Sequence, residues 1–219
     1  MILDSDCVWV DSADRVSADL DSYGLLAYDL GQRTTDSLSG ADLEDIYTEL
    51  DQRPQVKIPN YYGGELFAAR GDVIQRVVAE IGSVWENSLQ RFKEHKPKLY
   101  EEAFVLSYIY HRLGYAEPTA NAYIKRLWTG SKFNNVELAD MTLAIWHLPA
   151  EKKRGIKRLF HQACLSRSRF WRTPLGESFA RYVGQYVGIP TCGRKKYFLD
   201  MFDSQFSKLW DKVLSVRTA

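Results

Sequence analysis

The chain has 219 residues, of which 45% are hydrophobic and 13% aromatic, and its formal net charge is +1. This content can bury one sizeable core, and no apolar run of about 18 residues predicts a membrane span. Because the N-terminus lacks the layout of a secretion signal, we expect a cytoplasmic protein. The three cysteines have no paired ligand spacing, which argues against a disulfide framework and a zinc knuckle.

The charge is unevenly distributed along the chain. Residues 151–219 hold 15 Lys and Arg against 5 Asp and Glu, a net charge of +10, so residues 1–150 carry −9. Basic residues alternate with aromatic ones between Lys152 and Arg172, which suits an anionic surface or a phosphate-rich ligand. We therefore expect peripheral contact of residues 151–219 with an anionic membrane. A solvated helix face is an equal alternative. The acidic first part argues against a nucleic-acid partner.

Short apolar segments alternate with polar or helical sequence in the first half of the chain. Residues 2–3 are predicted to form a short apolar strand, and residues 24–29 and 65–69 are typical of buried strands. Residues 140–147 read as a further strand that delivers a polar side chain at its end. This alternation predicts an α/β fold.

Three helices are predicted from apolar residues at helical spacing. The first has the stripe Ile74, Val77, Val78, Ile81, Trp85 and Phe92, and the second has Leu106, Ile109, Tyr110 and Leu113. We expect both stripes to face the core. A third stripe, formed by Leu199, Phe202, Phe206, Leu209 and Val213, predicts a C-terminal helical appendage packed on the α/β part.

Two aspartates follow the first predicted strand. In Ile2-Leu3-Asp4-Ser5-Asp6 the carboxylates are separated by one residue, so a turn of the chain can direct both at one hard cation. A pair of surface aspartates in a turn is the alternative. The spacing makes Asp4 and Asp6 candidate ligands for a divalent metal.

With later segments, this pair resembles the GT-A glycosyltransferases, particularly family 8, whose DxD pair binds the manganese that bridges the donor diphosphate. Asn60-Tyr61-Tyr62-Gly63-Gly64-Glu65 is similar to the family's small-residue turn beside the donor sugar, where glycine permits close approach. Glu101-Glu102-Ala103-Phe104 is similar to the acidic start of a helix that lines the sugar pocket. An ordinary turn and an ordinary helix N-terminus are the alternatives for these segments.

The resemblance extends to His147 and Lys153, which are six residues apart. They are similar to the family's histidine metal ligand and its diphosphate-contacting lysine. A buried, hydrogen-bonded histidine is the alternative for His147. The family has Lys-Pro-Trp where this chain has Glu151-Lys152-Lys153-Arg154-Gly155, so Lys152 and Arg154 are equal candidates for the diphosphate contact.

The resemblance implies a metal-dependent transfer of a sugar from a nucleotide-sugar donor to a saccharide or lipid-linked acceptor. It implies manganese or magnesium on Asp4, Asp6 and His147, with Gly63, Gly64 and Lys153 at the donor and Glu101 and Glu102 as catalytic candidates. The implied fold is a partial GT-A mixed sheet over residues 1–155 with a basic helical subdomain over residues 156–219. The family's nucleotide-binding strands normally precede the DxD, whereas this sequence begins three residues before it, so we expect that part of the family fold to be missing. The resemblance covers about residues 1–160.

Two other functions remain open from the sequence. Asp4-Ser5-Asp6-Cys7-Val8 also resembles the signature of haloacid-dehalogenase-like phosphatases, in which Asp4 would be the nucleophile and Asp6 the general acid and base. The chain lacks that family's downstream acidic motif, because Gly71-Asp72 is not followed by the second aspartate. The other alternative is a non-catalytic binding protein that uses residues 151–219 to dock.

Overall fold

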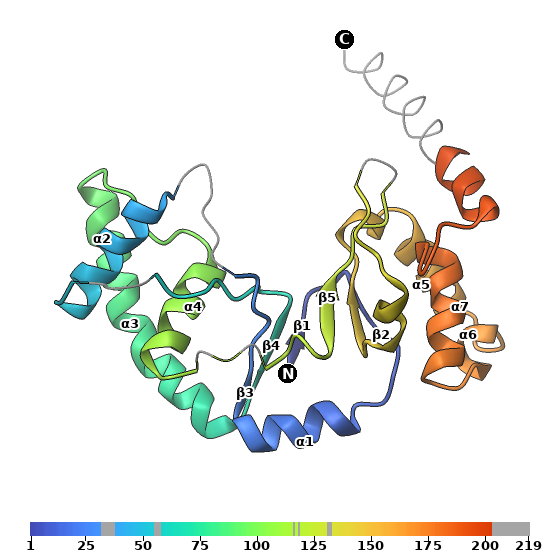
Figure 1. Cartoon of the computed structure of the whole chain (residues 1–219), viewed down its shortest axis with the longest axis horizontal. Helices are drawn as coiled ribbons and strands as arrows, with labels where there is room; N and C mark the ends of the chain where they lie inside the picture. Colours follow the sequence, from blue (N-terminus) through green and yellow to red (C-terminus); the bar gives the residue numbers. More distant parts are fainter. Residues whose placement is uncertain (32–37, 55–57, 116, 118, 131–132, 203–219) are drawn as a thin grey trace, which may run out of the picture. The chain divides into compact units, whose positions relative to one another are not determined.

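The computed structural model describes residues 1–31, 38–54, 58–115, 117, 119–130 and 133–202. The chain forms two compact units (Figure 1). Unit 1 comprises Met1–Asp4 and Asp14–Ala122, and unit 2 comprises Ser5–Ala13 and the chain from Tyr123 onward. Each unit combines a small sheet with helices, which confirms the α/β class. Among the described residues, no helix combines the length and the apolar character that crossing a membrane requires.

Unit 1 contains an antiparallel sheet in the order β1-β4-β3, with β1 at Ile2–Leu3, β4 at Leu66–Ala69 and β3 at Leu25–Leu26. Its helices are α1 (Asp14–Tyr23), α2 (Gly40–Asp51), α3 (Gly71–Lys93) and α4 (Glu102–Arg112). Gly24 follows α1 with a φ of +76°, a left-handed conformation that glycine adopts at little cost and that turns the chain into β3. The three segments of this unit predicted as strands are thereby confirmed as strands, with β3 shorter than residues 24–29; β3 is buried, whereas Ile2 of β1 is 68% exposed.

The burial of α3 corrects the prediction that its whole apolar stripe faces the core. Val73, Val77 and Val84 are buried, whereas Ile74, Val78, Ile81, Trp85 and Phe92 are exposed, with Trp85 at 61%. The buried face is displaced by one residue, or about 100° around the helix. This buried face includes Arg91, a charged residue that an apolar pattern does not select, whose guanidinium group is paired with Asp45 and Glu49. The second stripe is confirmed, because Ile109 and Tyr110 are buried and Leu106 and Leu113 pack against the same core.

Unit 2 contains a mixed sheet in the order β2-β6-β5, formed by β2 (Cys7–Trp9), β6 (Ile145–His147) and β5 (Ile124–Arg126). β6 runs antiparallel to β2 and parallel to β5. The 3-10 helices η1 (Leu138–Thr142) and η2 (Pro149–Glu151) flank β6. They are followed by α5 (Gly155–Ala163), α6 (Arg169–Arg172), α7 (Glu177–Val187) and helical residues 194–202.

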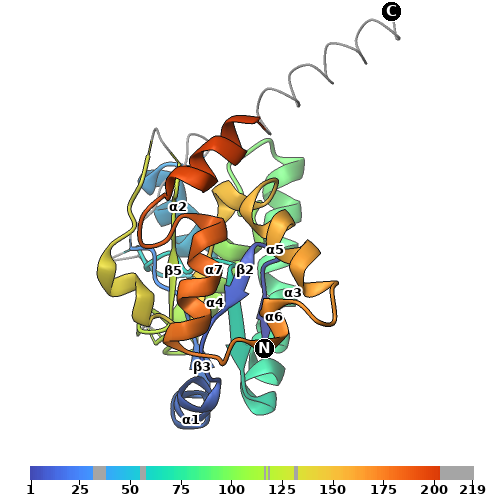
Figure 2. The ribbon, with the colours of Figure 1, turned by 90° about the vertical axis from the view of Figure 1, so that its right-hand side faces the viewer.

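The helices α5, α6 and α7 lie together beside this sheet, and Figure 2 shows α7 in front of the strands. The core between them includes Trp146 from the central strand and Leu159, Phe179 and Val183 from the helices. All three residues of β6 are buried, which follows from its position between β2 and β5. The sheet and helices therefore hold His147, at the end of β6, in a packed environment.

Two predictions for unit 2 are wrong in part. The strand begins at Ile145 and not at Asp140, because Asp140 accepts a 2.7 Å hydrogen bond from the Glu137 backbone N–H and caps η1. In the C-terminal stripe, Leu199 and Phe202 are exposed because this helical segment turns Lys196 inward. Phe206, Leu209 and Val213 lie outside the described residues.

The two units follow strand pairing and not the predicted boundary between residues 155 and 156. Residues 5–13 belong with the C-terminal half because β2 pairs with β6. The predicted division of roles, with a catalytic part at residues 1–155 and a basic subdomain at residues 156–219, stays a prediction.

Candidate metal and diphosphate site

The pairing of β2 with β6 brings Asp6 and His147 together. Cys7, the first residue of β2, lies opposite His147, the last residue of β6. The register is extended by the Leu148 backbone N–H, which donates a 2.9 Å hydrogen bond to the carbonyl oxygen of Asp6. Residues 141 positions apart in the sequence thus become neighbours through an antiparallel ladder.

Asp6 is a buried carboxylate between two cationic or potentially cationic groups. Its side chain is 0% exposed, and its Oδ1 lies 3.2 Å from Nε2 of His147. Its Oδ2 lies 3.1 Å from Nζ of Lys152. These are ion-pair distances, but neither oxygen receives a well-aligned hydrogen bond from the described residues. A buried carboxylate that lacks hydrogen bonds is costly for a fold that uses it only structurally.

Asp4 is joined to Asp6 through Ser5 alone, so the chain keeps the two carboxylates close. One ligand atom from each of Asp4, Asp6 and His147 lies within 4.8 Å of the other two. Two carboxylates and an imidazole form a donor set that suits a divalent cation such as Mn²⁺. The buried oxygens of Asp6 and this donor chemistry fit the metal that the sequence resemblance implies.

The lysine that contacts Asp6 is Lys152. Its side chain is 52% exposed, so the ammonium group lies at the boundary between the buried carboxylate and solvent. Lys153 and Arg154 are exposed on the same loop. The assignment of Lys153 to a diphosphate stays a prediction, and the contact with Asp6 favours Lys152 among the three candidates.

Glu151 anchors this loop, although no spacing argument had singled it out. Its carboxylate is 3% exposed and accepts hydrogen bonds from Thr129 Oγ1 at 2.6 Å, from the Gly155 backbone N–H at 3.0 Å and from Lys196 Nζ at 2.9 Å. Gly155 is required here, because a Cβ atom would lie 2.5 Å from Glu151 Oε2 and 2.6 Å from Tyr186 O. The contacts fix the residue next to Lys152.

Lys196 continues the anchor to Asp200, whose Oδ2 accepts a 2.5 Å hydrogen bond from Nζ. Burial disfavours the charged ammonium, but the hydrogen bonds to Asp200 and Glu151 outweigh it and raise the pKa of Lys196. Burial likewise opposes ionisation of Asp200, yet Lys196 and Arg158 lower the pKa of that carboxyl group. Both groups are therefore charged at neutral pH.

The remaining predicted residues gather in unit 1. A Cβ atom on Gly63 would lie 1.9 Å from Glu65 Oε2, so any larger residue would require the side chain of this buried glutamate to move. A Cβ atom on Gly64 would lie 3.2 Å from Glu102 Oε1. Glu101 accepts a 3.1 Å hydrogen bond from the Tyr61 hydroxyl group. The glycine turn and the start of α4 are thus neighbours within unit 1, and their role toward a sugar stays a prediction.

Comparisons of the chain with protein-family models, curated proteins and solved structures found no match. The functional argument therefore rests on the residues themselves. Asp6, His147 and Lys152 within unit 2 supply the clearest chemistry, because the buried Asp6 carboxylate lies between an imidazole and an ammonium group and receives no well-aligned hydrogen bond from the described residues.

Proposed function

We propose that this chain is a divalent-metal-dependent glycosyltransferase that uses a nucleotide-sugar donor. The observation that carries the proposal is the buried Asp6 carboxylate, flanked by His147 and Lys152 without well-aligned hydrogen bonds. A metal ligand and a diphosphate-neutralising cation are the two elements that such a donor site needs. The order of the sequence motifs supports the same conclusion.

Each residue of the site has a distinct part in the proposal. Asp4, Asp6 and His147 would hold Mn²⁺ or Mg²⁺, which when bound stabilises negative charge on the leaving nucleoside diphosphate. Lys152 neutralises the carboxylate of Asp6 and presents its half-exposed ammonium group to an anionic ligand. Lys153 and Arg154 add positive charge from the same loop. This charge would attract a diphosphate bound beside the loop, because Coulombic attraction increases as the distance between charges falls.

The test is calorimetric titration of UDP and of GDP into the full chain, with and without Mn²⁺. We expect metal-dependent binding of one nucleotide, weakened at least about 100-fold by Asp6→Asn because a direct ligand is lost. Asp140→Asn is the matched control. Asp140 is also buried in unit 2, but it is bonded by Lys125 at 3.0 Å and by the Glu137 N–H, so its loss should affect stability and not binding.

Two outcomes would contradict the proposal. One is equal nucleotide binding by the wild type and Asp6→Asn, and the other is no metal-dependent binding by a chain whose circular dichroism shows a folded state. Hydrolysis of p-nitrophenyl phosphate with Mg²⁺, abolished by Asp4→Asn, would support the phosphatase function instead. Transfer of radiolabelled sugar to water or an acceptor from the nucleotide sugar of whichever nucleoside diphosphate binds would complete the assignment.

A further inference from the structure

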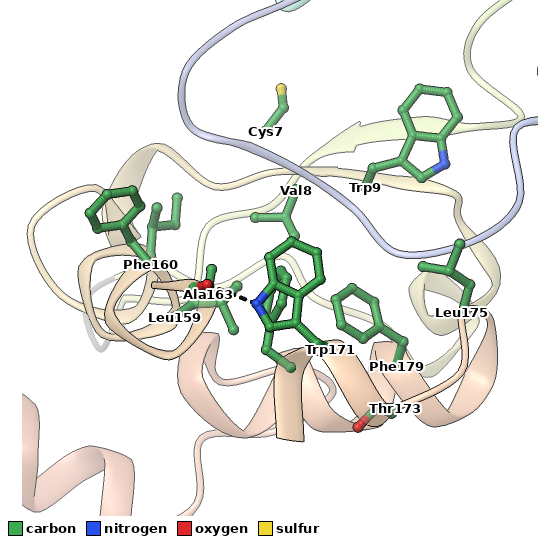
Figure 3. Close-up of a pocket in the computed structure, with 12 residues that line it drawn as sticks. Cys7, Val8, Trp9, Leu159, Phe160, Ala163, Trp171, Thr173, Leu175 and Phe179 are labelled. Carbon is green, nitrogen blue, oxygen red and sulfur yellow. Dashed lines mark hydrogen bonds between the residues drawn. The ribbon is translucent and has the colours of Figure 1, made fainter. Parts of the chain in front are cut away.

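Unit 2 contains an apolar pocket that the proposed function does not use. It has a volume of about 530 Å³ and lies between β2, α5, α6 and the start of α7 (Figure 3). This volume falls in the range of small-molecule sites. Val8 and Trp9 contribute from the strand, Leu159 and Phe160 from α5, and Trp171 and Phe179 from the helices that follow.

The side-chain N–H and O–H groups of Trp171, Trp9 and Thr173 in this lining already have partners within the protein. Trp171 Nε1 donates a 2.8 Å hydrogen bond to the carbonyl oxygen of Ala163, which holds the indole ring at the pocket (Figure 3). Trp9 Nε1 donates to the carbonyl oxygen of Asp11, and Thr173 Oγ1 donates to that of Arg169. The pocket therefore suits an occupant without hydrogen-bonding groups, such as a hydrocarbon chain.

Large apolar side chains around the pocket are exposed to solvent. Phe160 is 64% exposed, Trp171 and Leu175 are each 62% exposed, and Leu165 is 58% exposed. The rings of Phe170 and Trp171 pack edge to face with centroids 5.0 Å apart, and Phe170 packs in the same way against Phe179 at 5.2 Å. The aromatic wall is thus held in place while its outer edge is open to a ligand.

Positive charge surrounds these apolar residues in the sequence from 151 to 176. Within this segment the only carboxylate is Glu151, which is buried and paired with Lys196. Arg158 is paired with Asp200. The exposed basic residues are Lys152, Lys153, Arg154, Lys157, Arg167, Arg169 and Arg172. An apolar centre among cations complements an anionic amphiphile.

We propose that unit 2 docks on an anionic bilayer through α5 and α6, and that the pocket accepts the hydrocarbon chain of an anionic lipid. A protein segment fits less well, because its backbone N–H and C=O groups would enter a pocket with few free partners. The proposal does not depend on sugar transfer by the metal site.

The first test is flotation of the full chain with vesicles of phosphatidylcholine alone and of phosphatidylcholine with phosphatidylglycerol. We expect binding to the anionic vesicles only, weakened at least about tenfold by Phe160→Ala with Trp171→Ala. Phe92→Ala with Trp85→Ala is the matched control, because these α3 residues are 60% and 61% exposed in unit 1. Equal weakening by both pairs, or no vesicle binding by the folded wild type, would overturn the proposal.

A charge variant tests the exposed basic residues that surround the apolar pocket. Arg167→Gln with Arg172→Gln should weaken binding to anionic vesicles about fivefold for each cation removed, and added salt should reduce the difference. Arg53→Gln with Lys93→Gln removes two exposed cations from unit 1 and should leave binding unchanged. Binding that is insensitive to Arg167→Gln with Arg172→Gln would contradict electrostatic docking.

A soluble ligand tests the pocket separately from the surface. Decyl phosphate below its micellar concentration should bind the wild type, whereas inorganic phosphate should not, because the chain supplies most of the binding free energy. Ala163→Phe fills the pocket and should weaken decyl phosphate binding at least about tenfold, with folding checked by circular dichroism. Equal binding of decyl phosphate and inorganic phosphate would show a headgroup site and overturn the chain-binding pocket.

Discussion

Asp6 and Glu151 are two buried carboxylates in unit 2 whose surroundings differ sharply. Asp6 contacts His147 and Lys152 at the two ends of residues 147–152, and Glu151 lies within that segment. The two residues are 1% and 3% exposed. Glu151 accepts three hydrogen bonds of 2.6 to 3.0 Å. Asp6 has ionic neighbours at 3.2 Å and 3.1 Å but no well-aligned hydrogen bond among the described residues.

The difference separates a structural charge from a binding charge. A carboxylate with satisfied hydrogen bonds and a paired cation keeps a loop in one conformation. A carboxylate that retains open lone pairs beside an imidazole can accept a metal without breaking structural bonds. Arg91 in unit 1 is likewise a structural charge, because its guanidinium group donates hydrogen bonds to Asp45 at 2.7 Å, to Pro97 O at 2.6 Å and to Glu49.

The largest expected effect comes from breaking the Glu151 anchor. Lys196→Met leaves the buried Glu151 carboxylate without its cation, so the free energy of unfolding should fall by about 3 to 5 kcal/mol. Lys195→Met is the control, because the neighbouring lysine is exposed and should change stability by less than about 0.5 kcal/mol. Urea denaturation measures both, and similar midpoints for the two variants would contradict a structural role for the anchor.

Asp6→Asn and Glu151→Gln should have opposite consequences. Asp6→Asn should weaken Mn²⁺ binding at least about 100-fold, equivalent to about 2.7 kcal/mol, with little loss of stability. Glu151→Gln should lower the unfolding free energy by about 1 to 3 kcal/mol, because it weakens charge-assisted hydrogen bonds, and should retain Mn²⁺ binding. Calorimetry and urea denaturation on both variants test the comparison directly. Loss of metal binding only in Glu151→Gln would reverse the assignment.

Lys152→Gln should shift two affinities in opposite directions. Without the cation at 3.1 Å, Asp6 is free to bind Mn²⁺ several-fold more tightly. The affinity for nucleoside diphosphate in the presence of Mn²⁺ should fall about tenfold, because a charge-assisted contact is lost. Lys153→Gln is the control within the same loop. If Lys153→Gln lowered the nucleoside diphosphate affinity more than Lys152→Gln, the diphosphate contact would be assigned to Lys153, as the sequence resemblance implies.

The smallest expected effect concerns the ionisation of two tyrosines in unit 1. Burial, and then the charges of Asp29 and Glu117, raise the pKa of Tyr62 to about 12, and burial with the Asp51 hydrogen bond raises that of Tyr108 to about 12. An unfolded tyrosine ionises near pH 10, so the folded state loses stability as pH rises from about 10 to 12. Phenolate absorbance should show late-titrating tyrosines, with one fewer in Tyr108→Phe. An unchanged late phase in that variant would exclude Tyr108.

Part of the candidate site could be predicted because its signals are local. Asp4 and Asp6 follow a short apolar strand, and His147 ends another, so each position is visible within a few residues. Glu151 could not be found in this way, since its cation Lys196 is 45 residues further along the chain. The choice of Lys152 over Lys153 at the Asp6 contact likewise depends on how η2 leaves β6.

The sequence by itself determined the α/β class, the strands β3 and β4 and the stretches that become α3 and α4, because hydrophobic periodicity reflects local backbone geometry. Tertiary structure decided which face of α3 is buried. On that face, Arg91 forms ion pairs with Asp45 and Glu49 of α2, which lie 46 and 42 residues earlier in the sequence. It also decided that residues 5–13 join unit 2 through the β2–β6 ladder. The physical reason is that burial, ion pairing and strand pairing depend on partners that no local pattern specifies.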